Sequence, residues 1–410
     1  MIEKYYSGVI EQIYNRIGKE TRNIVMANYS NDFSIENLEV IRRYQSNEDN
    51  VFFAYSEFSY NTLVGAYEPF LDIICNMHRH FIGGSFDDFQ KECGVYYLHR
   101  QVLNSYYETG ECFREETVLL NEVAYEQRRM TKAIVDMLKR LSEVRPLMIV
   151  INRFQMASKS SIETIKYLID HPCTNIGIVL GANANVKGAD SAVEVWDRIV
   201  ESLEDRSAIY YIGSARPLKN STRTTDDDEL YVTTNFEQSI QETSNTMEFL
   251  DYEQAKRGCR IIEHKIKFED AWIDEKSLRR FYLVYARTSV LLGEMSKAIE
   301  LTNEYKALIP ESDSEHYFSI YYFMKGTCYM YQGKLEKAEG CAKKAYDYAL
   351  LADDELLEFK SELLSVMIKM SGWYNIFFCV QDIPVSDEFI RKDYKARIQK
   401  SSCAYIYLRI

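Results

Sequence analysis

The sequence predicts an α/β domain with a mostly parallel sheet covered by helices on both faces, followed by an all-α helical-repeat array. Between residues 21 and 215, short apolar runs of strand length alternate with amphipathic helical segments. From residue 236 onward this alternation ends and the pattern is helical throughout. Apolar strands without a polar face, separated by helices, are typical of a parallel sheet buried on both sides.

Composition supports two helix-rich domains. The chain has 410 residues, which suits two or three domains at roughly 100–200 residues each. Glycine (17) and proline (6) are scarce, and both are costly inside helices, so their scarcity favours helix. The net charge of −13 repels phosphate backbones, so we expect no direct nucleic-acid partner.

The cysteines and the apolar runs indicate the compartment. Nine cysteines occur at irregular spacing without a CxxC pair, which argues against a disulfide framework and a zinc site. No apolar run reaches the roughly 18 residues of a membrane span, and the acidic start of the chain is unlike a signal peptide. We therefore expect a cytoplasmic protein with no metal and no membrane partner.

Each element of the first domain follows from its local pattern. Five apolar runs predict strands at 23–27, 51–58, 147–151, 176–182 and 208–212. Helical spacing predicts helices over 1–20, 34–45, 68–81, most of 86–143, 160–170 and 190–204. Ligands of parallel sheets bind at the carboxyl ends of strands, so the loops after residues 27, 58, 151 and 182 are the candidate site.

A polar, acidic and threonine-rich stretch at 219–235 predicts a linker. It divides a domain of residues 1–218 from a helical array of residues 236–395, and residues 396–410 form a C-terminal tail. The tail shows no polar capping helix of the kind that repeat arrays need. We therefore expect the chain to be part of a longer protein or to pack its end on a partner.

The second half contains a repeat. Three glycines recur 40 and 39 residues apart, at Gly293, Gly333 and Gly372. The fifth residues after these glycines, and the matching residue of a weaker earlier unit, are Ala298, Ala338, Phe377 and Ala255. This spacing resembles the tetratricopeptide repeat, in which small residues let paired helices approach and glycine relieves the turn. A non-repetitive helical bundle is the alternative.

The first domain resembles a family of signalling ATPases. Residues 146–158, PLMIVINRFQMAS, resemble the Walker B segment of the STAND class, which is AAA-related and includes MalT-like proteins. Residues 51–74 and 176–186 resemble the neighbouring strands of that class, and the resemblance covers residues 1–215. It implies a P-loop-NTPase-like sheet followed by helical repeats. An ordinary α/β sheet without this ancestry is the alternative.

The positions that carry chemistry in that family are altered. Its two Walker B acids correspond to Asn152 and Arg153, and its sensor arginine to Ala184. The segment 27–34 lacks the glycines and lysine of a P-loop, and only Ser34 matches the residue that normally contacts magnesium. The resemblance thus assigns Ser34, Asn152 and Arg153 to a degenerate nucleotide site without the groups needed for phosphoryl transfer. We expect no cofactor, with ATP or ADP and Mg²⁺ bound only if the divergent site still holds them.

We therefore expect a non-enzymatic signalling or scaffold protein, a pseudo-ATPase domain coupled to repeats that bind a protein or peptide. Tyrosines near helical spacing in one repeat are the candidate partner-binding residues: Tyr317, Tyr321, Tyr322 and Tyr329. Two further interpretations stay open. One is a nucleotide-binding STAND-type switch with a divergent site, and the other is a transcription regulator of that class without its DNA-binding domain.

Overall fold

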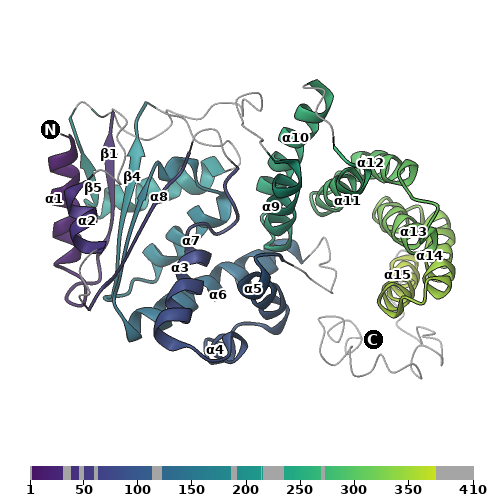
Figure 1. Ribbon diagram of the computed structural model, residues 1–410, viewed down its shortest axis with the longest axis horizontal. Helices are drawn as coiled ribbons and strands as arrows, with labels where there is room; N and C mark the ends of the chain where they lie inside the picture. Colours follow the sequence, from purple (N-terminus) through teal and green to yellow (C-terminus); the bar gives the residue numbers. More distant parts are fainter. Residues whose placement is uncertain are drawn as a thin grey trace.

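The predicted fold class is confirmed by the computed structural model, in which a parallel sheet with helices precedes a helical array (Figure 1). The structure describes residues 2–30, 38–45, 50–59, 63–112, 122–185, 192–213, 215, 235–268 and 273–374. None of the helices in these ranges is long and apolar enough to cross a lipid bilayer.

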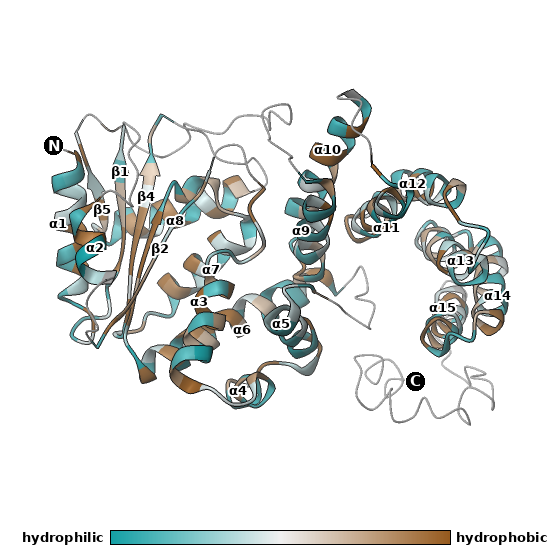
Figure 2. Ribbon diagram, viewed as in Figure 1, coloured by the Kyte–Doolittle hydropathy of each residue, from teal (hydrophilic) through white to brown (hydrophobic). Residues whose placement is uncertain are grey.

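The sheet has five strands in the order β2-β3-β4-β1-β5, and every neighbouring pair is parallel. The order places β4 between β1 and β3, so the carboxyl ends of these three strands share one edge. Mainly hydrophobic residues form the strands (Figure 2). The strands are β1 (Ile24–Tyr29), β2 (Phe52–Glu57), β3 (Leu147–Asn152), β4 (Ile176–Asn183) and β5 (Ile209–Tyr211).

Helices cover both faces of the sheet (Figure 1). On β3, Leu147, Ile149 and Ile151 join the core beneath α6 and α7, whereas Met148 and Val150 join the core beneath α1. Successive strand residues point to opposite faces, so this two-sided burial explains why the strands are continuously apolar. The first-domain helices are α1 (Ile2–Tyr14), α2 (Glu39–Gln45), α3 (Phe70–Met77), a π-helical turn (His78–Ile82), α4 (Phe86–Glu92), α5 (Tyr97–Thr109), α6 (Val123–Val144), α7 (Lys159–Asp170) and α8 (Val193–Asp205).

The first helix is shorter than its sequence pattern predicts. The pattern predicts a helix over 1–20, but α1 ends at Tyr14. Gly18 adopts a left-handed φ of 78°, and its backbone N–H donates to the carbonyl of Thr174 at 2.8 Å. Only glycine adopts this backbone conformation without a Cβ penalty, so the chain turns here toward β1.

The second half consists of paired helices joined by short turns (Figure 1). Asn235 caps the first of them, because its side chain accepts a hydrogen bond from the backbone N–H of Gln238 at 3.2 Å. The helices are α9 (Phe236–Glu248), α10 (Tyr252–Phe268), α11 (Glu275–Leu291), α12 (Met295–Ala307), α13 (Ser314–Tyr331), α14 (Leu335–Leu351) and α15 (Glu355–Tyr374).

One turn geometry recurs between paired helices. Leu250, Gly293 and Gly333 adopt left-handed φ values of 71°, 79° and 72°. The next residue in each case donates its N–H to the carbonyl five residues before it, as in a Schellman C-cap. The small residues that follow these turns are all fully buried: Ala255, Ala298 and Ala338. The predicted repeat therefore corresponds to recurring helical hairpins.

The prediction of a third turn glycine is wrong. Gly372 lies inside α15, which continues to Tyr374, and Phe377 lies outside the described residues. The tight turn before α15 instead uses Asp353, with a φ of 54°. Aspartate tolerates this conformation because its short polar side chain bonds locally. Since α15 begins only at Glu355, residue 372 falls in its last turn rather than in a loop.

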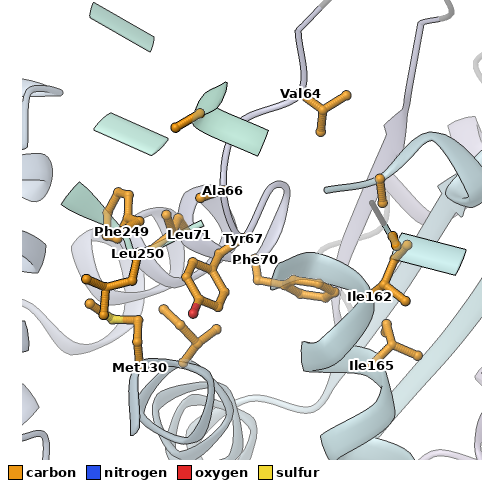
Figure 3. Close-up of a cluster of buried hydrophobic side chains, with 14 of the residues drawn as sticks. Val64, Ala66, Tyr67, Phe70, Leu71, Met130, Ile162, Ile165, Phe249 and Leu250 are labelled. Atoms are coloured by element: carbon orange, nitrogen blue, oxygen red, sulfur yellow. The ribbon is translucent and has the colours of Figure 1, made fainter. Parts of the chain in front are cut away.

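An aromatic core joins the array to the α/β domain (Figure 3). Tyr67 meets Phe249 edge to face, with ring centroids 6.2 Å apart. Phe249 and Leu250 lie in the turn between α9 and α10, and both are buried. Met130 of α6 packs into the same cluster. One hydrophobic core therefore runs across the boundary between the two domains.

Asp251 joins two helices at this boundary between the α/β domain and the helical array, which we call the seam. Its Oδ2 accepts the backbone N–H of Ser160, in the first turn of α7, at 2.9 Å. Its Oδ1 accepts the backbone N–H of Gln254, in the first turn of α10, at 3.4 Å. The side chain is buried, and this burial raises the pKa of the carboxyl, against the hydrogen bonds from Ser160. One carboxylate thus faces the positive ends of two helix dipoles.

Further polar contacts cross the seam. Lys159 pairs with Glu253 at 2.9 Å. Three side-chain amides also donate to backbone carbonyls across the boundary: Gln127 to Leu250 at 2.6 Å, Asn245 to Gly110 at 2.9 Å, and Gln254 to Val64 at 3.0 Å. These bonds satisfy loop carbonyls that folding removes from water, so they favour one relative placement of the two domains.

Glu163 of α7 lies beside the same seam. Burial raises the pKa of its carboxyl to about 7, Asp251 and Glu253 add to the rise, and Lys159 and Arg128 oppose it. In the unfolded chain the carboxyl returns toward its ordinary pKa of 4.5. The folded protein therefore binds this proton more tightly, and its stability falls as pH rises through the interval between the two values.

We expect Asp251→Ala to lower the free energy of unfolding by about 2–4 kcal/mol, because it removes the caps of two helices and leaves buried N–H groups without acceptors. Urea unfolding monitored by circular dichroism measures the loss. Asp274→Ala is the matched control, because Asp274 is exposed and caps only α11, at Ser277. An equal loss in the two variants would contradict the double-cap role of Asp251.

Ionisation of Glu163 should contribute about 3 kcal/mol to a fall in wild-type stability between about pH 5 and about pH 8. We expect Glu163→Gln to remove this contribution, because glutamine cannot ionise. Urea unfolding of the wild type and the variant across this pH interval measures the difference. Glu108→Gln, at an exposed position of α5, is the control. The explanation fails if the two variants follow the same pH profile.

Candidate functional site

The candidate site is the sheet edge formed by the carboxyl ends of β1, β3 and β4. The segments 24–30, 147–158 and 176–185 contain one charged residue, Arg153. The other polar groups at this edge are mainly carboxamides and hydroxyls. Carboxylates bring negative charge to magnesium and can accept a proton from water, whereas a neutral amide offers an uncharged oxygen and cannot act as a base. These three segments therefore offer hydrogen bonding and no general base.

Asn152 lies where the sequence predicts, at the end of β3, and its side chain is fully buried. The hydroxyl of Tyr29, the last residue of β1, donates to its Oδ1. Tyr6 of α1 packs edge to face on Tyr29, with ring centroids 6.3 Å apart. Burial raises the pKa of the Tyr6 hydroxyl well above its usual range. Two phenol groups thus lie close to the Asn152 amide.

Gly181 of β4 makes this arrangement possible. A Cβ at Gly181 would lie 2.6 Å from the Tyr6 hydroxyl oxygen and 2.7 Å from Oδ1 of Asn152. Both distances are well inside van der Waals contact, so any larger side chain would displace the tyrosine or the amide. The glycine therefore serves close packing between β3, β4 and α1.

Arg153 turns toward the opposite neighbour of β3. It adopts a left-handed φ of 52°, and its guanidinium pairs with Glu57 at 3.0 Å. The same Nη1 donates to the carbonyl of Phe58 at 3.3 Å. Both charged side chains are about four-fifths buried, with exposed fractions of 19% and 20%. The structure therefore separates Asn152, which faces β1, from Arg153, which faces the end of β2.

Hydrogen bonds to β1 and to the residue after it hold the residues that follow β4. The backbone N–H of Ala184, which the sequence resemblance aligns with a sensor arginine, donates to the carbonyl of Tyr29 at 2.7 Å. The side chain of Asn185 reaches the carbonyl of Ser30 at 2.5 Å. These bonds join β4 to β1 beyond the strand ends. Ser34, the third predicted site residue, lies outside the described residues.

The four predicted tyrosines lie on α13, and each has a basic neighbour. Tyr321 is buried, at 3% exposure, and the other three are half-buried. The cations above their rings, with distances to the ring centroid, are Arg279 over Tyr317 (4.5 Å), Lys306 and Lys325 over Tyr321 (5.4 and 5.1 Å), Lys344 over Tyr322 (5.1 Å), and Lys334 and Lys337 over Tyr329 (6.0 and 5.9 Å).

Sequence reasoning missed the partners of these residues. Glu57, which holds Arg153, is 96 positions away in the chain, and Tyr29 and Asn152 are 123 positions apart. Only the pair Tyr321 and Lys325 carries a local signal, because residues four apart on a helix are neighbours.

A scan against models of protein families matches none of them, and a search of curated proteins finds no match. The geometry of the site therefore carries the functional argument. In the ranges that the structure describes, no three His, Cys, Asp or Glu side chains come together in a metal-binding group.

We expect millimolar Mg-ATP or Mg-ADP to leave the melting temperature unchanged, because the described part of this edge presents amides and phenols and its one charged side chain, Arg153, is paired with Glu57. A ligand at about 100 times its Kd would stabilise the protein by about 2.7 kcal/mol, or raise the melting temperature by about 5–10 °C. Differential scanning calorimetry measures this shift. A rise that Arg153→Ala abolishes would contradict the expectation and establish a nucleotide site.

Proposed function

We propose that this protein is a non-enzymatic signalling or scaffold component that binds a protein or peptide through its helical array. In this proposal the α/β domain is a pseudo-ATPase platform. Its resemblance to STAND-class ATPases over residues 1–215 supports that ancestry. The amide at Asn152 and the ion pair between Arg153 and Glu57 support the loss of the family's chemistry.

The observation that carries the proposal is the set of cations around the α13 tyrosines. Tyrosine is enriched where proteins bind other proteins, because its ring gives apolar contact and its hydroxyl a hydrogen bond, and cations beside it add charge complementarity to a partner. Stacked helical hairpins present such side chains along an extended surface, since each hairpin buries its apolar residues against its neighbours. The surface of α11 to α14 therefore suits a polypeptide partner.

The seam supports a fixed platform. The first hairpin, α9 and α10, is bound to the α/β domain by the Tyr67–Phe249 contact and the Asp251 caps. The later helices, α11 to α15, project from it as an arc (Figure 1). A partner bound to the arc would thus be held at a constant position relative to the sheet.

We expect a photo-crosslinking amino acid at Tyr329 to capture a discrete protein partner in cells of the source organism. Tyr329 is half-buried on the array and lies near Lys334 and Lys337. The same substitution at Tyr125, which is 57% exposed on α6, is the control and should give no matching adduct. Mass spectrometry of the adducts identifies the partner. Adducts at Tyr125 alone, or at neither position, would contradict binding through the array.

A further inference from the structure

The basic groups around the α13 tyrosines share one arrangement. Many lysines elsewhere in the described residues form ion pairs with carboxylates, among them Lys91, Lys132, Lys159, Lys166, Lys256, Lys267 and Lys297. Five others, within the same described ranges, lie over tyrosine rings and have no carboxylate at ion-pairing distance: Lys306, Lys325, Lys334, Lys337 and Lys344. In a chain with a net charge of −13, these five ammonium groups thus lie over rings with no carboxylate contact among the described residues.

These lysines form one continuous group. The ammonium of Lys325 donates to the Tyr321 hydroxyl at 2.7 Å and lies near Tyr329. Burial raises the pKa of the Cys341 thiol, and the nearby ammonium groups of Lys325 and Lys344 oppose that rise. Lys325 of α13 and Lys344 of α14 therefore flank the same thiol, which links the two helices into a single surface.

The spacing along α14 places its basic and aromatic residues of this surface on one side of the helix. Lys337, Cys341, Lys344 and Tyr348 recur three or four residues apart, which places them on one side of the helix. Tyr348 stacks on Tyr322 of α13, with ring centroids 5.7 Å apart and planes at 8°. The rings are therefore held in place by each other, and the lysines stand beside a preformed aromatic surface.

We propose that this lysine–tyrosine face, formed by Lys306, Tyr322, Lys325, Tyr329, Lys337 and Lys344, binds a segment of a partner protein rich in aspartate and glutamate. The proposal rests on the function proposed above and names the chemical class of the partner. Four of its lysines are exposed or half-buried beside aromatic rings, and their charge is left unneutralised by the described residues. An acidic segment supplies the missing carboxylates, and its apolar groups contact the rings.

A short acidic peptide fits this face better than a nucleic acid. The basic group is confined to α12, α13 and α14, and carboxylates on the same helices border it, such as Glu304, Glu336 and Asp347. A long polyanion would extend beyond the lysines onto this acidic surface, where like charges repel.

The test measures binding of the full chain to a fluorescein-labelled peptide of aspartate and glutamate interspersed with leucine. Fluorescence anisotropy at low and high salt gives Kd, and the same peptide with asparagine and glutamine tests the role of charge. We expect the acidic peptide to bind, the neutral peptide to bind far more weakly, and added salt to raise Kd.

Two variants of the lysine–tyrosine face, one in α14 and one in both α13 and α14, locate the site. We expect Lys344→Gln to raise Kd about twofold to fivefold, and Lys325→Gln with Lys344→Gln to raise it about tenfold. Lys343→Gln is the matched control: Lys343 is exposed and adjacent in sequence, but it lies on a different side of α14 and contacts no tyrosine ring in the described structure. The melting temperatures of all variants should match that of the wild type.

Three outcomes would overturn the proposal: equal weakening by Lys343→Gln and Lys344→Gln, equal binding of the acidic and neutral peptides, or tighter binding of a labelled single-stranded oligonucleotide. Failure here is distinguishable from failure of the proposed function. If Tyr329 crosslinks to a partner while the acidic peptide does not bind, the array binds proteins and only the chemical class is wrong. If neither occurs, both proposals fail.

Discussion

The arrangement of the two domains depends on one buried carboxylate. Asp251 accepts hydrogen bonds from the first turns of α7 and α10, which belong to different domains. Burying a carboxylate is costly, and the hydrogen bonds at the positive ends of two helices offset part of that cost here, although burial still raises the pKa of the carboxyl. The Tyr67–Phe249 contact excludes water beside it. Directional hydrogen bonds and apolar packing thus act together at the seam, and they fix the orientation of the helical array relative to the α/β domain.

The described sheet edge holds its strands together with neutral polar groups. Amides and phenols at Asn152, Tyr29 and Tyr6 preserve hydrogen bonding between strands without the charges that a magnesium nucleotide requires. Arg153 is held by Glu57, so its charge is balanced inside the protein. Such an edge contributes packing and stability to the platform, which agrees with a proposed role as support for the array.

The helices of the array are joined by turns of the same left-handed backbone geometry, although different residue types occupy them. Gly293 and Gly333 are visible in the sequence because glycine is the usual residue at a left-handed C-cap. Leu250 and Asp353 adopt the same handedness without that signal, with φ values of 71° and 54°. The sequence therefore revealed the repeat where glycine marks the turn and misplaced it at Gly372, where the backbone is helical.

The sequence by itself determined the order of strands and helices and the buried alanines that follow the turns at Leu250, Gly293 and Gly333, because apolar periodicity and turn chemistry act within a few residues. Only the tertiary structure decided the strand order, the separation of Asn152 from Arg153 and the double cap at Asp251. It also decided which lysines lie over the tyrosines of α13. These features join residues that are far apart along the chain, and packing in three dimensions selects among partners that a local pattern leaves equivalent.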